Sequence, residues 1–162
     1  MNQDIKSTQR IVLIALVGFT VYWFANAVFW IPWVINRWLG IAVMILLTPC
    51  LWGFASWYCL RYSPEKHWQK DRWFIAGIFL VIAIFSDFFF FAVWRRIPDQ
   101  LYHPTTFAAY GLIMMIPFIT SVIAVKMHKT KTACSLSGTT LLKVGLSGIL
   151  FFLITLYSVR FS

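Results

Sequence analysis

Five long apolar runs constrain the fold of this chain more than any other feature. They cover residues 11–31, 39–60, 73–94, 105–125 and 142–159. A helix needs about twenty mostly apolar residues to cross a hydrocarbon core about 30 Å thick. Near-continuous apolarity does not fit a barrel strand, in which lipid-facing and lumen-facing residues alternate. The sequence therefore predicts an all-α integral membrane bundle of five transmembrane helices, which forms a single transmembrane domain over residues 1–162 with no extramembrane domain.

The composition excludes the soluble classes of protein. Charged residues make up 12% of the chain and apolar residues 60%, whereas an ordinary soluble domain has roughly 25% charged residues. The net charge of +9 would suit a nucleic-acid partner in a soluble protein. Here the basic residues lie in short clusters between apolar runs, where they contact lipid headgroups. We expect membrane lipids as partners, and no nucleic acid.

The basic residues also predict an orientation in the membrane. The N-terminal tail and the loops after the second and fourth runs carry Lys6, Arg10, Arg61, Lys66, Lys70, Arg72, Lys126, Lys129, Lys131 and Lys143. The opposite side carries Arg37, Arg95, Arg96 and Arg160. Because basic loops stay in the cytoplasm, we expect a multi-pass protein of the cell inner membrane with its N-terminus cytoplasmic and its C-terminus outside.

Asp87 is the one acid that falls inside a predicted span; the sequence places Asp71 in the loop before it. Asp87 precedes Trp94 by seven residues, so a rise of 1.5 Å per residue places it about 10 Å beneath the outer boundary. An acid at that depth is costly unless it is neutralised, paired or hydrated. The sequence leaves two interpretations open: a hydrogen-bonded acid that joins helices, or a site for a proton, an ion or a substrate.

Other polar residues are expected near the depth of Asp87. The same arithmetic brings Asn26, Tyr110 and Tyr157 close to that level, and Thr48 slightly deeper. We therefore expect either a polar layer around Asp87 or a small cavity that opens outward. Depth does not fix the rotation of a helix, so interhelical hydrogen bonding for Asn26 and a membrane-interface position for both tyrosines stay open as alternatives.

A second, weaker candidate site lies at the outer rim. Arg95, Arg96, His103 and Arg37 could hold a phosphate or carboxylate headgroup, although arginines that follow a membrane helix are also ordinary anchors. The histidines fall on opposite sides of the predicted membrane and no C-x-x-C pair occurs. We therefore predict no metal, no cofactor and no catalytic residue.

Small residues and prolines mark the expected packing surfaces of the helices. Small residues recur at a spacing of three in the second and fifth runs, which allows close helix approach. These residues are Cys50, Gly53, Ser56 and Cys59, together with Gly145 and Gly148. Pro49 and Pro117 lie near the middle of their spans, where each removes a backbone hydrogen bond.

Residues 11–125 resemble a family of small multi-helix bacterial inner-membrane proteins of unknown function. The shared features are Ile31-Pro32 closing the first helix, Thr48-Pro49 in the second, a basic loop after Leu60, and Asp87 followed by Ile97-Pro98. That family is four-helical, so the fifth run departs from it. The resemblance implies no activity.

These observations give three functional hypotheses. The leading one is a non-enzymatic accessory or scaffold subunit of a membrane assembly, which associates with copies of itself or with another membrane protein. The first alternative is a small transporter or lipid-binding protein that uses Asp87 as a proton or cation site. The second alternative is a membrane enzyme that acts on a lipid headgroup at the outer rim.

Overall fold

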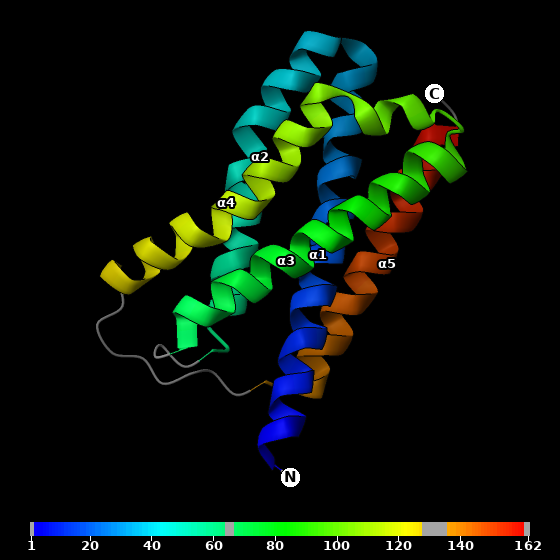
Figure 1. The fold of residues 1–162 in the computed structure, drawn as a ribbon. Helices are drawn as coiled ribbons and strands as arrows, with labels where there is room; N and C mark the ends of the chain where they lie inside the picture. The colour runs from blue at the N-terminus through cyan, green and yellow to red at the C-terminus, as the bar shows by residue number, and fades with distance from the viewer. Residues whose placement is uncertain (1, 64–66, 128–135, 161–162) are drawn as a thin grey trace.

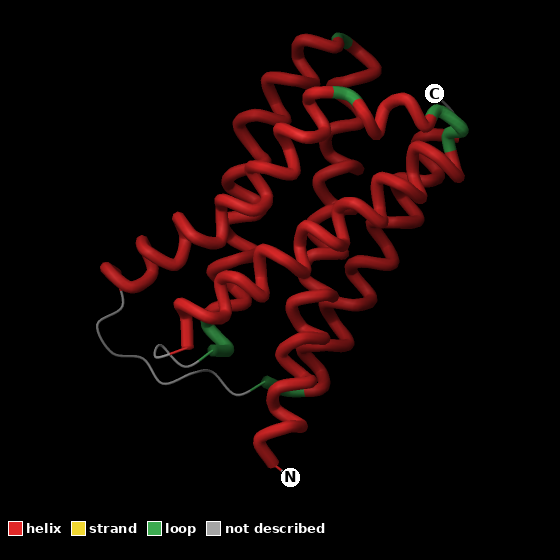
Figure 2. Tube along the Cα trace, viewed as in Figure 1, coloured by secondary structure: helices red, strands yellow, loops and turns green. Residues whose placement is uncertain are grey.

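The computed structural model describes residues 2–63, 67–127 and 136–160, and these residues form a helical bundle (Figure 1). In the described part of the chain every regular element is a helix (Figure 2). The elements are α1 (Asn2–Ile35), α2 (Arg37–Leu60), α3 (Trp68–Asp87), the π-helix η2 (Phe88–Trp94), the 3₁₀-helix η3 (Pro98–Tyr102), α4 (Pro104–Met127) and α5 (Gly138–Arg160).

Five of these segments are long and apolar enough to cross a membrane. They are Thr8–Trp30, Trp38–Leu60, Trp68–Trp94, Pro104–Ala124 and Gly138–Val159. The predicted all-α bundle with five spanning helices is therefore confirmed, and the chain is a multi-pass membrane protein. The fifth run, which had no counterpart in the resembling family, is one of the five.

α1 lies at the centre of the bundle. It packs against α5, α2 and α3, while α4 covers α3 and α2. The N-terminus lies at the same end of the bundle as the last turns of α2 and α4 and the first turns of α3 and α5 (Figure 1). The C-terminus lies at the opposite end. Successive helices therefore run in alternate directions, and five of them place the two termini at opposite ends of the bundle.

Two predicted helix boundaries need correction. Pro32 does not close the first helix but lies inside α1, whose last turn continues through a hydrogen bond from the Asn36 amide to the Pro32 carbonyl oxygen (2.9 Å). The third helix begins at Trp68 rather than Trp73, so Asp71 belongs to its first turn and not to a loop. Asp71 is tolerated in that turn because Arg10 of α1 and Ser63, which precedes α3, both donate hydrogen bonds to its carboxylate.

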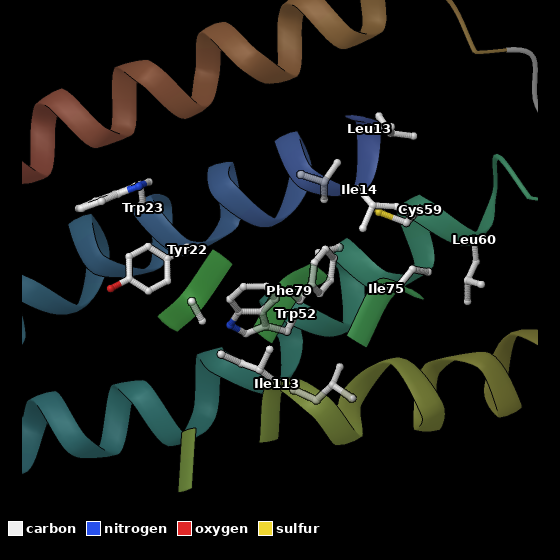
Figure 3. Packing of buried hydrophobic residues seen from close by; sticks show 14 of the residues in the cluster. Leu13, Ile14, Tyr22, Trp23, Trp52, Cys59, Leu60, Ile75, Phe79 and Ile113 are labelled. Atoms are coloured by element: carbon white, nitrogen blue, oxygen red, sulfur yellow. The ribbon is translucent and has the colours of Figure 1, made fainter. Parts of the chain in front are cut away.

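A buried apolar core rich in aromatic rings lies between α1, α2, α3 and α4. Trp52 of α2 packs on Phe79 of α3 with ring centroids 5.0 Å apart, at the centre of the cluster in Figure 3. Phe79 also approaches α1 at Gly18, where a Cβ would lie 2.9 Å from its ring. Burial of such rings away from lipid depends on tight van der Waals contact, since lipid is as apolar as the core.

Apart from Cys50, the small residues lie at contacts between helices within the chain. Gly53 faces Thr120 and Ile116 of α4, and Ser56 is fully buried. Cys59 is buried whereas Cys50 is exposed, because nine residues along a helix correspond to opposite faces. Pro49 and Pro117 lie within α2 and α4, which both continue through them.

Candidate functional site

Asp87 is held by two tyrosines from two other helices. The Tyr22 hydroxyl of α1 donates a hydrogen bond to Oδ1 of Asp87. The Tyr110 hydroxyl of α4 donates to Oδ2 over 2.7 Å. Both carboxyl oxygens are therefore bonded inside the bundle, and α1, α3 and α4 meet at this point. We call these three residues the Asp87 cluster.

The backbone changes character directly after Asp87. Asp87 ends α3, and the π-helix η2 begins at Phe88. Its wider turn is visible in the bond from the Arg95 amide to the Phe90 carbonyl oxygen (2.9 Å). Phe90 is buried between Trp23 and Trp30 of α1. The π-helix thus forms the last part of the third span and ends at Trp94.

Tyr22 lies on the inner face of α1. Figure 3 shows Tyr22 and Trp23 on different sides of α1, with Trp23 toward α5 and Tyr22 toward the interior of the bundle. The Tyr22 side chain is only 5% exposed. The two rings meet edge to face with centroids 5.2 Å apart. The phenol that reaches Asp87 is thus fixed by its neighbours as well as by its hydrogen bond.

The structure brings together only part of the predicted polar layer. Tyr110 contacts Asp87, whereas the Asn26 side chain donates to the Tyr22 carbonyl oxygen of its own helix (3.0 Å). Tyr157 is 68% exposed on the outer face of α5, and Thr48 is buried on α2. Of the groups expected to meet Asp87, only Tyr110 does so through a direct hydrogen bond among the described contacts.

Sequence reasoning missed Tyr22 as a partner of Asp87. Depth arithmetic selected Asn26, and Tyr22 lies one helical turn before it. Residues four apart share a helix face, and the long phenol side chain reaches beyond the depth of its own backbone. A search for polar residues one turn from Asn26 would have found it.

Arg95 and His103 of the predicted outer rim contact different partners. The Arg95 guanidinium lies 4.7 Å from the centroid of the Trp30 ring, and partial burial lowers the pKa of Arg95. Arg96 follows the π-helix two residues after its end and lies in the left-handed region with φ 54°. His103 Nδ1 lies 2.8 Å from the Thr105 hydroxyl at the start of α4, and Arg37 is the first residue of α2. Arg95 therefore serves as an anchor on an aromatic ring.

A second polar cluster lies at the N-terminal end of the bundle. Arg10 of α1 forms an ion pair with Oδ2 of Asp71 in α3 (2.5 Å) and donates to the Ser63 hydroxyl oxygen (3.0 Å). The Ser63 hydroxyl donates to Asp71, and Trp68 Nε1 donates to the Ser63 carbonyl oxygen (2.9 Å). We call this the Asp71 cluster. Sequence analysis did not predict it, because Asp71 was assigned to a loop.

Metal-binding groups do not gather in the described residues: no three His, Cys, Asp or Glu side chains there could hold one metal ion. No protein-family model matches the chain, and comparisons with curated proteins and with solved structures give no significant match. The comparisons therefore add no family to the resemblance noted from the sequence.

Proposed function

We propose that this chain is a non-enzymatic accessory or scaffold subunit of a membrane assembly in a bacterial inner membrane. The observation that carries this proposal is that both oxygens of Asp87 accept hydrogen bonds from tyrosines of neighbouring helices. The acid thereby fastens α1, α3 and α4 and needs no ligand to be tolerated at its depth. The excess of basic residues toward the N-terminal end supports the proposed orientation.

α5 is the element that we propose presents a face to the partner. It packs along α1 at the edge of the bundle (Figure 1), and its outward leucines Leu146, Leu150 and Leu153 are all exposed. Its inner face is committed to α1, since the Thr20 hydroxyl of α1 donates to the Val144 carbonyl oxygen (2.9 Å). A helix held on one side in this way can offer the other side to a second protein.

Photo-crosslinking in native membranes tests this role. A photoreactive phenylalanine at Leu146 or Leu153 should give one discrete protein adduct of the same mass from both positions. The matched control is Leu46, an exposed leucine on α2, which should give none. A second, differently tagged copy distinguishes self-association from a foreign partner. Indistinguishable patterns at all three positions, or monomer alone at each, would contradict the proposal.

A proton or cation site at Asp87 is the second candidate function. The incomplete burial of Asp87 favours it, because a half-buried carboxyl group stays open to exchange of a proton or cation. In this case Asp87→Asn should leave the folded yield unchanged and abolish a pH-dependent change in tryptophan fluorescence, which Trp23 beside Tyr22 would report. A collapse in folded yield with no pH-dependent signal in the native chain would favour the fastening role alone.

A further inference from the structure

Arg72 forms no ion pair with any acid in the described part of the chain. It lies one turn into α3, is half-buried, and its Nε is buried with no hydrogen-bond partner. Its guanidinium carbon lies 5.3 Å from the centroid of the Phe118 ring of α4. A buried donor without an acceptor costs about 1–3 kcal/mol. Because Nε is closed off in this conformation, an anion would reach the half-buried guanidinium from its exposed side.

The neighbouring acid does not fill that role. Asp71 is adjacent to Arg72 in sequence, but its carboxylate is bound by Arg10 and by the Ser63 hydroxyl. Consecutive helix residues point in directions about 100° apart and do not face each other. The Asp71 cluster thus neutralises Arg10, and Asp71 does not neutralise Arg72.

The surface beside Arg72 suits an acyl chain. Trp73 and Phe74 follow directly on α3 and are both exposed. The Trp73 ring meets Phe118 edge to face with centroids 4.6 Å apart, so Phe118 links this apolar surface to the guanidinium. A ligand held here would have a charged group at Arg72 and an apolar chain along Trp73, which shares Phe118 with the guanidinium.

We propose that Arg72 binds the phosphate of an anionic phospholipid beside the contact between α3 and α4 at Phe118, at the N-terminal end of the bundle. The planar guanidinium matches two phosphate oxygens at once, which a lysine ammonium does not. Anionic lipids of the cytoplasmic leaflet are attracted by basic residues close to the membrane, and the orientation predicted above places Arg72 in that leaflet.

Native mass spectrometry of the purified full chain tests the proposal, with phosphatidylglycerol and phosphatidylcholine as probes. Lys70 supplies the matched control, since it is an exposed base of the same helical turn. We expect Arg72→Gln to weaken phosphatidylglycerol binding about tenfold. Lys70→Gln removes the same charge and should weaken it about threefold or less, as a nonspecific surface attraction predicts. Phosphatidylcholine binding should not distinguish the two variants.

Arg72→Lys is the control for misfolding, because it keeps the positive charge and removes only the planar guanidinium group. It should weaken binding by more than Lys70→Arg changes it. Equal losses from Arg72→Gln and Lys70→Gln, together with no loss from Arg72→Lys, would overturn the proposal. Displacement of the bound lipid by millimolar inorganic phosphate would overturn the lipid assignment in favour of a free phosphate site, and unchanged lipid occupancy would support it.

Discussion

Asp87 shows how a single acid is accommodated among apolar helices. A carboxyl group in hydrocarbon must be neutralised or hydrogen-bonded, and here two phenol groups bond to its two oxygens. The partners come from α1 and α4, so loss of either bond affects the packing of a different helix pair. The two tyrosines differ in their surroundings, since Tyr22 is fully inside the bundle and Tyr110 is half-buried.

This difference predicts an order for the two tyrosine variants. Tyr22→Phe should lower the free energy of unfolding by about 1–2 kcal/mol, because it leaves a buried carboxyl oxygen without a partner. Tyr110→Phe should cost less, near the ~0.6 kcal/mol average for polar contacts in membrane helices, because its site is more open to other donors. Unfolding by increasing SDS in mixed micelles measures both. Tyr102→Phe, at a side chain that is 75% exposed, is the control; an equal loss in all three variants would contradict the prediction.

The residues of the Asp87 cluster could be predicted from the sequence only in part. Depth follows from a fixed rise per residue, and this was enough to select Asp87 and Tyr110. Rotation depends on which side chains pack between helices, and the apolar residues of α1 and α5 occupy all sides of each helix, so they do not indicate which face is buried. For this reason Tyr157, at a suitable depth, lies on the outer face, while Tyr22 was overlooked.

At the scale of elements, α5 depends on α1 for its position. A Cβ at Gly148 would lie 2.7 Å from the Thr20 hydroxyl oxygen and 2.9 Å from the Phe19 ring. The Thr155 hydroxyl of α5 also donates to the Trp23 carbonyl oxygen of α1 (3.2 Å). The close approach at Gly148 is therefore needed for the hydrogen bonds between α1 and α5.

Substitution of Gly148 should separate the two helices. Gly148→Ala should destabilise the protein by about 1–3 kcal/mol, the usual cost of overpacking a tight contact. Gly145→Ala should be nearly neutral, because a Cβ there would lie 3.6 Å from Leu16, an ordinary contact. Thermal unfolding in detergent compares the two variants. A similar loss for both would mean that the helices approach in a different register.

The start of α3 shows why helix ends were harder to predict than spans. Apolar periodicity indicated Trp73 as the first residue, yet Trp68 and Asp71 are buried in the preceding turn. Asp71 is hydrogen-bonded by Arg10 of α1, which is distant in the sequence, and Trp68 donates to Ser63, which lies in the loop before α3. The π-helix after Asp87 was likewise not predicted, because its residues, four of them consecutive phenylalanines, form an apolar run that reads as α-helix.

The Asp71 cluster should couple α1 to α3 energetically. Removal of Arg10 leaves a buried carboxylate with one fewer donor, and removal of Asp71 leaves a partly buried guanidinium unpaired. Each of Arg10→Gln and Asp71→Asn should therefore destabilise the protein by about 1–3 kcal/mol. The double variant should cost clearly less than the sum. Additive losses in SDS unfolding would show that the pair contributes no coupling.

At the scale of the whole molecule, two polar clusters lie toward opposite ends of an apolar bundle. The Asp71 cluster holds the N-terminal end, and the Asp87 cluster lies nearer the end where η3 connects α3 to α4. The basic residues of the sequence lie mainly on the side of the Asp71 cluster. The Asp71 cluster therefore lies at the end of the bundle that the basic residues assign to the cytoplasm.

Cysteine labelling tests this orientation. In a chain with Cys50, Cys59 and Cys134 replaced, a cysteine at Gln100 in η3 should react with a membrane-impermeant maleimide on intact spheroplasts. One at Gln69, an exposed residue near the start of α3, should react only after permeabilisation, because basic ends stay in the cytoplasm. Alkaline phosphatase fused after Ser162 should be active, since five spans carry the C-terminus outside. Labelling of Gln69 alone would reverse the orientation, and an inactive fusion beside a labelled Gln100 would mean that α5 does not cross the membrane.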